Sequence, residues 1–432
     1  MLDVKLLREK PEVVRKDLEK RKDKEKLKYL SEFLKYDKKW RDVLHKIDKL
    51  RHRRNVLSQE IAAMKSRKNA KKNSEISKRI AEVKKISKNT KKLEIEAEKN
   101  NNIARDLHMK IPNILDKSVP VGKDDTNNVE IRKVGKTPKF AFKAKNHVEI
   151  AGALGLADFE RGAKIAGAGF YYLKNDLVRL DYALQKFAID FLMKKGFTLI
   201  EPPYMIKRKP YEGVTDLSDF ELVTYKIEGE DAYLIATSEH PMAAMYLNEV
   251  LDKKNLPIKL CGVSPCFRKE IGTHGKYTKG LFRVHQFNKI EQFIFCEPSE
   301  SWRYHEELQK NSEELYKKLG LHYRVVNICT GDIGTIAAKK YDIEVWMADG
   351  NYRETGSNSN CTDYQARRLN VRFREKEGAA PSGFVHTLNN TAIATSRIMI
   401  AILEQYQQKD GSVKIPRALQ PYMDGLKVMN KS

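Results

Sequence analysis

The sequence lacks the features of several large protein classes. It has no apolar run near the roughly 18 residues that a membrane-spanning helix needs, and its first residues, MLDVKLLREKPEVV, contain no apolar core of signal-peptide length. It has only five cysteines, none of them in a CxxC pair, which argues against a disulfide framework or a zinc knuckle. We therefore expect a cytoplasmic protein with reduced, buried thiols.

Motifs of nucleotide and metal chemistry are also missing. Neither the GxGxxG of dinucleotide-binding folds nor the GxxxxGK[ST] of phosphate loops occurs. HExxH and HxxEH are absent too, and the ten histidines follow no spacing typical of metal ligands. If the protein binds ATP, it does so without a phosphate loop of that type.

Positive charge is concentrated towards the N-terminus. The 432 residues carry a formal net charge of +24, and residues 1–110 hold 35 lysines and arginines against 18 acidic residues. A basic excess in one segment indicates a polyanionic partner, of which nucleic acid is the simplest and an anionic membrane surface the competitor. The length predicts two or more domains.

The basic segment has the apolar pattern of a helical hairpin. Residues 1–26 predict a short helical lead interrupted at Pro11, and a long helix follows. Apolar residues recur at alternating steps of three and four within 27–64 and, less regularly, within 83–111, on either side of the basic tract 65–73. We expect an antiparallel coiled-coil arm whose first helix is on the order of 55 Å long.

The distal part of this arm is its most basic part. Residues 51–90 hold 13 lysines and arginines against 3 acidic residues. A solvated coiled-coil surface or a dimerisation rod would also carry many charges. The concentration of positive charge near the tip favours contacts with nucleic-acid phosphates.

The chain changes character after Pro112. Residues 115–139 are rich in Pro, Gly, Asp and Asn and indicate a linker, and the composition from there on is that of a mixed globular domain. Residues 181–195 predict a helix, and 196–201 predict a strand that two prolines end.

A second strand delivers polar residues to the start of a helix. Residues 233–246 predict this strand–helix unit, with Thr237, Ser238 and Glu239 at the junction. From the residue types alone, a helix cap is the simpler interpretation, because Ser and Thr suit the cap position and Glu the first turn.

The most informative stretch runs from Cys261 to Cys296. It predicts two strands joined by a Gly-rich basic loop at 271–280, with alternation resuming at Phe282. One face of the second strand then carries Arg283, Phe287 and Glu291, a cation, a ring and a carboxylate. A ligand with phosphates, a flat base and an ammonium group could bind along that line. The alternative is a surface hairpin with solvated charges.

Two further segments carry candidate functional residues. Residues 348–374 predict a polar loop that contains Glu354, Ser357 and Asn360, which either turns in solvent or coordinates a ligand. Residues 386–406 predict a polar strand that continues into an apolar helix with Arg397 near its start.

These segments together resemble one enzyme family. FRKE at 267–270 and GLFRVHQFNKIE at 280–291 are similar to motif 2 of the class II aminoacyl-tRNA synthetases, in the version found in seryl-tRNA synthetases. The helix–strand–proline unit at 181–203 is similar to motif 1, and HTLNNTAIATSR at 386–397 to motif 3. The resemblance covers essentially the whole chain.

The resemblance implies a fold, an activity and partners. The expected fold is α+β, an antiparallel sheet flanked by helices, preceded by an all-α coiled-coil hairpin, with domains at 1–111 (helical arm), 112–139 (linker) and 140–432 (catalytic). The expected activity is that of a serine–tRNA ligase: L-serine and ATP give seryl-adenylate, and the seryl group passes to tRNA(Ser), and in principle to selenocysteine tRNA. The arm would bind the tRNA, and the enzyme would be a homodimer with no membrane partner.

The resemblance also assigns roles to residues. Arg268 would bridge the serine carboxylate and the α-phosphate of ATP, and Arg397, assisted by Arg283, would hold the γ-phosphate. Phe287 would stack on adenine, and Glu270 would accept a hydrogen bond from the adenine amino group.

Two larger sets follow from the same resemblance. The serine-binding residues would be Thr237, Ser238, Glu239, Glu291, Asn389 and Thr391. The ATP-binding residues would be Arg268, Lys269, Glu270, Arg283, Val284, Phe287, Glu354, Thr355, Gly356, Ser357 and Arg397, with Glu354 and Ser357 also binding Mg²⁺.

The sequence departs from the family pattern at two places. Two adjacent serines and a cysteine usually follow the metal-binding glutamate, whereas Gly356, Ser357 and Asn358 stand here. Gly169 occupies a position where many relatives have arginine.

Rival interpretations come from other classes of protein. A class II ligase that charges a carrier protein would lack the long arm. A non-catalytic RNA-binding relative would tend to lose residues such as Arg268, Glu354 and Arg397. A coiled-coil scaffold fused to an unrelated domain would leave the three ordered motifs unexplained.

Overall fold

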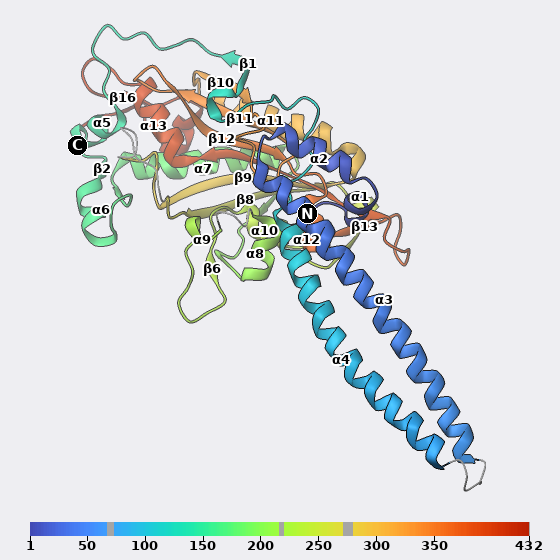
Figure 1. Ribbon diagram of the computed structural model, residues 1–432. Helices are drawn as coiled ribbons and strands as arrows, with labels where there is room; N and C mark the ends of the chain where they lie inside the picture. The colour runs from blue at the N-terminus through green and yellow to red at the C-terminus, as the bar shows by residue number, and fades with distance from the viewer. Residues whose placement is uncertain (67–72, 216–219, 271–279, 432) are drawn as a thin grey trace. The chain divides into compact units, whose positions relative to one another are not determined.

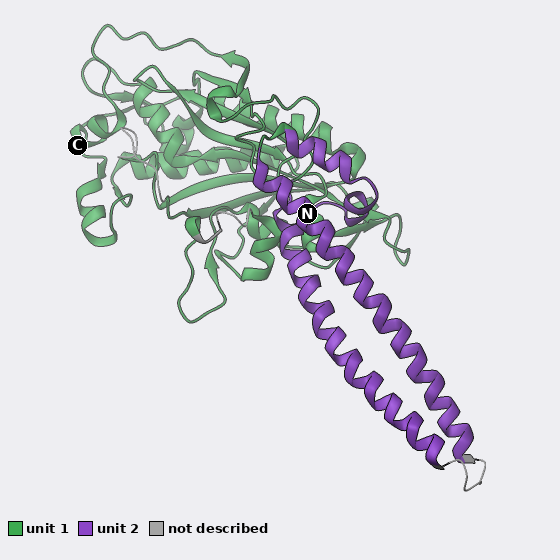
Figure 2. Ribbon diagram, in the orientation of Figure 1, with its two compact units in different colours: residues 1, 20–22, 113–432 green, residues 2–19, 23–112 purple. Residues whose placement is uncertain are grey.

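A computed structural model of the protein describes residues 1–66, 73–215, 220–270 and 280–431 (Figure 1). It divides into two compact units, one of residues 2–19 and 23–112 and the other of residues 1, 20–22 and 113–432 (Figure 2). Most of the predicted basic tract at 65–73 and most of the predicted loop at 271–280 lie outside the described residues. No helix in the described ranges has the length and apolar content to span a membrane.

The smaller unit is helical, as its sequence pattern predicts. It contains α1 (Val4–Glu9), α2 (Pro11–Lys20), α3 (Lys24–Ser66) and α4 (Asn73–Lys110). Pro11 begins α2 because its missing N–H is not needed in the first turn. The long helices α3 and α4 run antiparallel, and Val43, Ile47 and Ala97 pack between them, so the predicted hairpin is confirmed.

The larger unit is built on an eight-stranded sheet. Its spatial order is β1-β10-β11-β12-β15-β9-β8-β4, and every neighbouring pair is antiparallel except β4 with β8, which confirms the predicted fold class. The strand bounds, in spatial order, are β1 (Val129–Val134), β10 (Tyr323–Asn327), β11 (Lys339–Trp346), β12 (Tyr352–Asn360), β15 (His386–Ala394), β9 (Gln286–Cys296), β8 (Ile258–Phe267) and β4 (Thr198–Ile200). The segment predicted as a linker therefore contributes the edge strand β1.

The two faces of this sheet are covered differently. Helices α7 (Asp176–Lys194), α11 (Ser301–Lys318) and α13 (Thr395–Gln405) pack on one face, where Ile290 and Ile294 of β9 join the main apolar core. On the other face, Phe293 and Phe295 pack against the short helices α8 (Arg208–Val214), α10 (Glu239–Ala244) and α12 (Tyr364–Leu369). The predicted alternation is thus confirmed for β9.

Besides four 3-10 helices, the remaining elements in the described ranges are short α-helices and small sheets. They are α5 (His147–Ala153), α6 (Phe159–Ala166), α9 (Phe220–Val223) and four small sheets: β13 (Arg372–Arg374) between β14 (Gly383–Phe384) and β7 (Val250–Asp252), β5 (Met205–Ile206) with β6 (Tyr233–Leu234), β2 (Ala157–Asp158) with β3 (Tyr172–Leu173), and β16 (Val413–Lys414) with β17 (Val428–Met429).

Two sequence predictions about these elements are wrong. The second strand of the central hairpin begins at Gln286 rather than at Phe282, because its partner β8 ends at Phe267, which pairs with Gln286. The segment predicted as a polar loop forms strand β12 and helix α12. Several of its polar side chains are buried, and hydrogen bonds satisfy them: Asn358 donates to the carbonyl of His305 on α11, a contact that residue composition does not reveal.

Candidate active site

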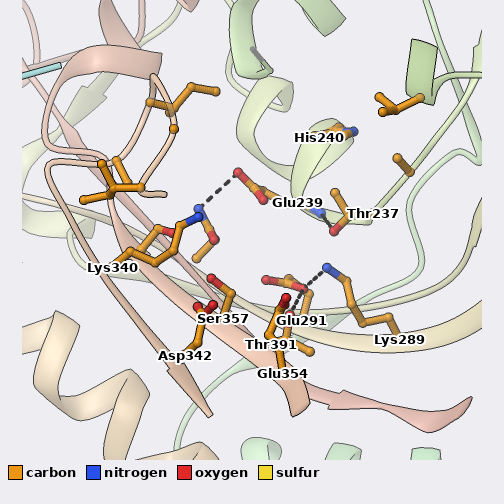
Figure 3. A pocket seen from close by; sticks show the side chains of 18 of the residues that line it. Thr237, Glu239, His240, Lys289, Glu291, Lys340, Asp342, Glu354, Ser357 and Thr391 are labelled. Atoms are coloured by element: carbon orange, nitrogen blue, oxygen red, sulfur yellow. Dashed lines mark hydrogen bonds and ion pairs between the residues drawn. The ribbon is translucent and has the colours of Figure 1, made fainter. Parts of the chain in front are cut away.

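A cavity of about 680 Å³ opens on the sheet face opposite α7, α11 and α13. This volume is typical of small-molecule sites. Figure 3 shows acidic and hydroxyl side chains of β9, β11, β12 and β15 facing residues at the start of α10 across the cavity. The charged and polar lining includes Thr237, Glu239, His240, Arg268, Glu270, Arg283, Lys289, Glu291, Asp332, Lys340, Asp342, Glu354, Ser357, Ser359, Asn389 and Thr391.

One end of the cavity is built on β9. Lys289 and Glu291 are two residues apart, so they share a strand face, and their Nζ and Oε2 atoms form a buried ion pair at 2.5 Å. Thr391 of β15 lies directly opposite Glu291 in the sheet, and its hydroxyl donates to Oε2 at 3.4 Å. This end can therefore offer a carboxylate and a hydroxyl to a ligand.

Glu239 faces this group from the start of α10. Its Oε1 accepts hydrogen bonds from the side-chain amides of Gln365 and Asn389, both at 3.0 Å. Burial and then the charge of Glu291 raise the pKa of Glu239 to about 7. A cationic ligand between the two carboxylates would relieve their repulsion.

The junction before α10 serves both the helix and the cavity. The Thr237 hydroxyl accepts from the Glu239 N–H at 3.2 Å, as a local turn does, and Thr237 also lines the cavity. Ser238 occupies the cap position, but its side chain makes no capping hydrogen bond. The simple cap interpretation is therefore incomplete.

Two arginines line the cavity as well. Arg268 follows β8 and donates through Nε to the carbonyl of Ala236 at 3.2 Å, with its guanidinium 5.3 Å from the ring centre of Phe287. Arg283 precedes β9 and contacts Glu270 at 3.4 Å. Because Arg283 lies outside the strand, the predicted line of Arg283, Phe287 and Glu291 on one strand face is wrong.

A β-bulge brings Glu354 and Ser357 together. Residues three apart on a regular strand point to opposite faces. In β12, Glu354 pairs with Glu344 and Gly356 with Ile343, so Thr355 is an extra residue that reverses the alternation. Glu354 and Ser357 consequently both line the cavity, whereas the Thr355 hydroxyl donates to Ile343 and accepts from Tyr316 in the helix layer.

Asp342 completes the oxygen-rich wall beside these residues. It pairs with Ser357 across β11 and β12, and its Oδ1 is buried and has no hydrogen-bond partner. Burial and then the nearby Glu354 carboxylate raise the pKa of Asp342. No group of three or more acidic, His or Cys side chains suited to a metal ion occurs within the described ranges.

Arg397 reaches this wall from the first turn of α13. Its Nη1 donates to the carbonyl of Glu354 at 2.9 Å and lies 3.4 Å from the Glu354 carboxylate, while the guanidinium is 4.9 Å from the ring centre of Phe282. Burial opposes ionisation of Glu354, but the charges of Arg397, Lys340, Arg268 and Lys289 together outweigh it and lower the pKa of Glu354.

The cavity unites most of the residues that the sequence predicts for the site. Its lining includes Thr237, Glu239, Arg268, Glu270, Arg283, Glu291, Glu354, Ser357, Asn389 and Thr391. The predicted residues that do not line it are Ser238, Lys269, Val284, Phe287, Thr355, Gly356 and Arg397. Among these, Ser238, Val284 and Thr355 are buried, and Phe287 and Arg397 contact lining residues.

Several lining residues escaped the sequence analysis. Lys289 could have been found, because strand alternation places it beside Glu291. Lys340 and Asp342 also share a face of their strand, but β11 was not predicted. The segment 332–337 and Cys361 line the cavity without a sequence signal that points to a ligand.

Both departures from the family pattern have local structural explanations. Gly169 has φ +86°, and a Cβ there would lie 2.5 Å from the His285 ring, so an arginine would require a rearrangement. A Cβ at Gly356 would lie 3.1 Å from the carbonyl oxygen of Thr391, which is a tight contact on the side away from Ser357.

Comparisons with known proteins agree over the whole chain. The family "tRNA synthetase class II core domain (G, H, P, S and T)" matches residues 222–406, and "Seryl-tRNA synthetase N-terminal domain" matches residues 1–115. The chain is 57% identical to a serine–tRNA ligase of Methanocella arvoryzae, over 99% of this chain and all of the relative.

Solved structures give the same result. The crystal structure of a seryl-tRNA synthetase from Pyrococcus horikoshii complexed with ATP matches with a TM-score of 0.93 and 49% identity, covering all of both chains. A cytoplasmic serine–tRNA ligase from Naegleria fowleri in complex with AMP matches with a TM-score of 0.86 and 38% identity, covering 100% of this chain and 99% of the other.

The raised pKa of Glu239 predicts a pH dependence of stability. The folded protein holds this proton up to about pH 7, whereas the unfolded chain releases it near 4.5, so stability present at acid pH is lost as the pH rises between these values. Glu239→Gln keeps an oxygen for the two amide donors and does not titrate. Relative to wild type, we expect it to gain about 1 to 3 kcal/mol of stability between about pH 5 and pH 8.

Thermal unfolding of both proteins across this pH range measures the effect. Glu249→Gln, at an exposed glutamate, is the control and should follow wild type. If the unfolding temperatures of wild type and Glu239→Gln change with pH in parallel, that result would contradict the raised pKa of Glu239.

Proposed function

The chain belongs to the seryl-tRNA synthetase family, and from this premise we propose that it activates L-serine with ATP and transfers the seryl group to tRNA(Ser). The single observation that carries the proposal is the composition of the cavity. Carboxylates, hydroxyls and the arginines Arg268 and Arg283 line one cavity. An amino acid and a nucleoside triphosphate need these complementary groups in one continuous space.

Activation is an in-line attack that needs no protein nucleophile. The serine carboxylate attacks the α-phosphate, and pyrophosphate leaves. The protein contributes by positioning the reactants and by neutralising charge that builds up in the transition state. In our proposal Arg268 bridges the carboxylate and the α-phosphate, and Arg283 and Arg397 hold the departing phosphates.

The adenine would bind beside these arginines. We assign the stacking surface to Phe287 and the acceptor for the adenine amino group to Glu270. Lys269, Val284, Thr355 and Gly356 would contribute to ATP binding through their backbone and packing, since their side chains do not line the cavity.

The oxygen-rich wall fits Mg²⁺. Glu354 and Ser357 offer a carboxylate and a hydroxyl on one face, and the buried Oδ1 of Asp342 lacks a hydrogen-bond partner beside them. Mg²⁺ prefers oxygen ligands and is commonly held by one or two carboxylates together with substrate phosphates. When bound, the ion would neutralise phosphate charge.

Selection of serine would depend on hydrogen bonds to its ammonium and hydroxyl groups. Glu291, Glu239 and Thr237 can accept from the ammonium, while Asn389 and Thr391 border the space for the side chain. A buried site built around a hydroxyl rejects alanine because its polar groups would stay unpaired. Ser238 supports the same wall from a buried position.

The helical unit is the proposed tRNA-binding part. On α3 and α4, Leu50, Lys85, Ile86, Lys88, Asn89 and Lys92 line a groove with a cavity of about 540 Å³. Closely spaced ammonium groups suit the phosphate backbone of an RNA helix. Protein side chains read the base sequence of such a helix poorly, so contacts with its backbone dominate. Selenocysteine tRNA, with the same acceptor chemistry, is an additional candidate substrate.

We further propose a cytoplasmic homodimer. Motif 1 corresponds to α7 and β4, and Tyr182, Met193 and Leu199 in these elements are exposed apolar side chains. Strand β4 lies at the edge of the large sheet, where a second copy of the chain could cover it.

The rival functions have less support. A carrier-protein ligase does not account for the N-terminal domain, which matches that of seryl-tRNA synthetases over residues 1–115. A non-catalytic relative does not account for a cavity in which Arg268, Glu291 and Glu354 are all retained.

The proposed activity predicts serine-dependent exchange of pyrophosphate into ATP in the absence of tRNA. We expect exchange with L-serine and none above background with the other standard amino acids. Exchange with another amino acid would mean that the pocket is misassigned. A folded protein that binds tRNA but shows no exchange would favour the non-catalytic alternative.

Arg397→Ala should remove phosphate stabilisation with little effect on folding, because the guanidinium lies at the edge of the apolar core, against Glu354 and the partly buried Phe282. We expect the exchange rate to fall about a hundredfold or more, as for loss of one charge-stabilising donor. Arg303→Ala, at an arginine whose side chain is 58% exposed, is the control. Near-normal exchange in Arg397→Ala would rule out the assigned role.

Deletion of residues 51–91, with Leu50 joined to Lys92 by a short Gly-Ser linker, should separate the two steps. Serine-dependent exchange should persist, because the cavity lies entirely within the larger unit. Charging of tRNA should be lost, because the basic part of the arm is absent. Charging at a similar rate to wild type would show that the arm does not hold the tRNA.

A further inference from the structure

A buried carboxylate outside the cavity connects three distant segments of the larger unit. Glu404 lies on α13 seven residues after Arg397, which is about two turns and places both on one helix face. Its Oε1 accepts from the backbone N–H and from Nδ1 of His147, both at 2.9 Å, and its Oε2 accepts from the N–H of Ala348 at 2.8 Å. The Glu404 and His147 side chains are 0% and 2% exposed.

His147 carries this connection to a fourth segment. The backbone N–H of Leu281 donates to Nε2 of His147 at 3.2 Å. A backbone N–H can only donate, so Nε2 is the unprotonated nitrogen and Nδ1 carries the proton that Glu404 accepts. The ring is therefore neutral and in one tautomer, and both of its nitrogens take part in hydrogen bonds.

The segment held in this way contains residues of the phosphate-binding end. Leu281 precedes Phe282, on whose ring Arg397 lies, and Arg283, which pairs with Glu270. Gly280 fits closely against His147, since a Cβ there would lie 2.3 Å from Nε2. Residues 280–283 thus meet α13 twice, directly through Arg397 and indirectly through His147 and Glu404.

We propose that His147 is a positioning residue for ATP: it fixes residues 281–283 relative to α13, and thereby sets Arg283 and Arg397 at the spacing that the triphosphate requires. The inference rests on the proposed function. Without an acceptor at Nε2, the buried N–H of Leu281 would lose its partner, and the segment would move to recover a hydrogen bond. The serine-binding end, on β9 and β15, has no part in this network.

A neighbouring residue provides a matched structural control. Gln407, just after α13, accepts from the N–H of Lys145 at 2.8 Å and donates to its carbonyl at 3.0 Å. It therefore connects the end of α13 to the chain just before α5, two residues from His147, but its hydrogen bonds do not reach residues 280–283. Gln407→Met should lower the unfolding temperature without changing ATP recognition.

Two substitutions at His147 test the roles of its two ring nitrogens separately. The amide of glutamine reaches the position of Nε2 and can accept from Leu281, whereas the shorter amide of asparagine replaces Nδ1 alone. In serine-dependent pyrophosphate exchange we expect His147→Asn to raise KM for ATP about tenfold, as for loss of one buried hydrogen bond, and to leave KM for serine within about twofold. His147→Gln should restore KM for ATP to within about threefold of wild type.

Calorimetric titration with ATP provides a second measure, since Kd should follow the same order without turnover. Equal KM values for ATP in His147→Asn and wild type, or an equal increase in Gln407→Met, would overturn the inference. If His147→Asn does not fold, Gly280→Ala, which displaces the ring, should raise KM for ATP instead, and an unchanged value would overturn the inference. Absence of exchange in wild type would refute the proposed function, a separate result.

Discussion

Strand β9 pairs along its length with β8 on one side and β15 on the other, and this double pairing fixes the orientation of every side chain on it. Ile290 and Ile294 enter the helix-covered core, whereas Lys289 and Glu291 face the cavity. A shift of one residue would exchange the two faces and place charges in the core. The site therefore depends on the same hydrogen-bond ladder that holds the sheet together.

The electrostatics of the cavity follow from this arrangement. Burial of Glu239 and then the charge of Glu291 raise the pKa of Glu239, because a low-dielectric environment and a like charge both disfavour its ionised form. The ion pair of Lys289 with Glu291 compensates part of that repulsion in the absence of a ligand. The side chains of Arg283 and Arg397 are partly exposed, which suits the polyphosphate site that we propose for them.

Helix α13 connects several polar groups of the larger unit that lie far apart in the sequence. It continues directly from β15, which supplies Asn389 and Thr391, so these two cavity residues and Arg397 have fixed relative positions. Its far end carries Glu404, which is buried among backbone donors from other segments. A single helix thus relates the cavity residues of β15, Arg397 and the chain at 280–283, and the buried polar groups around it are paired by hydrogen bonds.

The sequence by itself determined the helical hairpin, the unequal charge of the two units, the strands around motif 2 and a part of the cavity lining, to which most of the predicted site residues belong. Those features depend on short-range periodicity and on ordered motifs, which a linear chain displays directly. Only the tertiary structure decided that β12 is a strand, because its buried polar groups depend on partners in α11 and β15. It also decided that Glu354 and Ser357 share a face, because one extra residue at Thr355 reverses the alternation. The contact of His147 with Glu404 joins residues 257 positions apart, and no local pattern encodes such a distance.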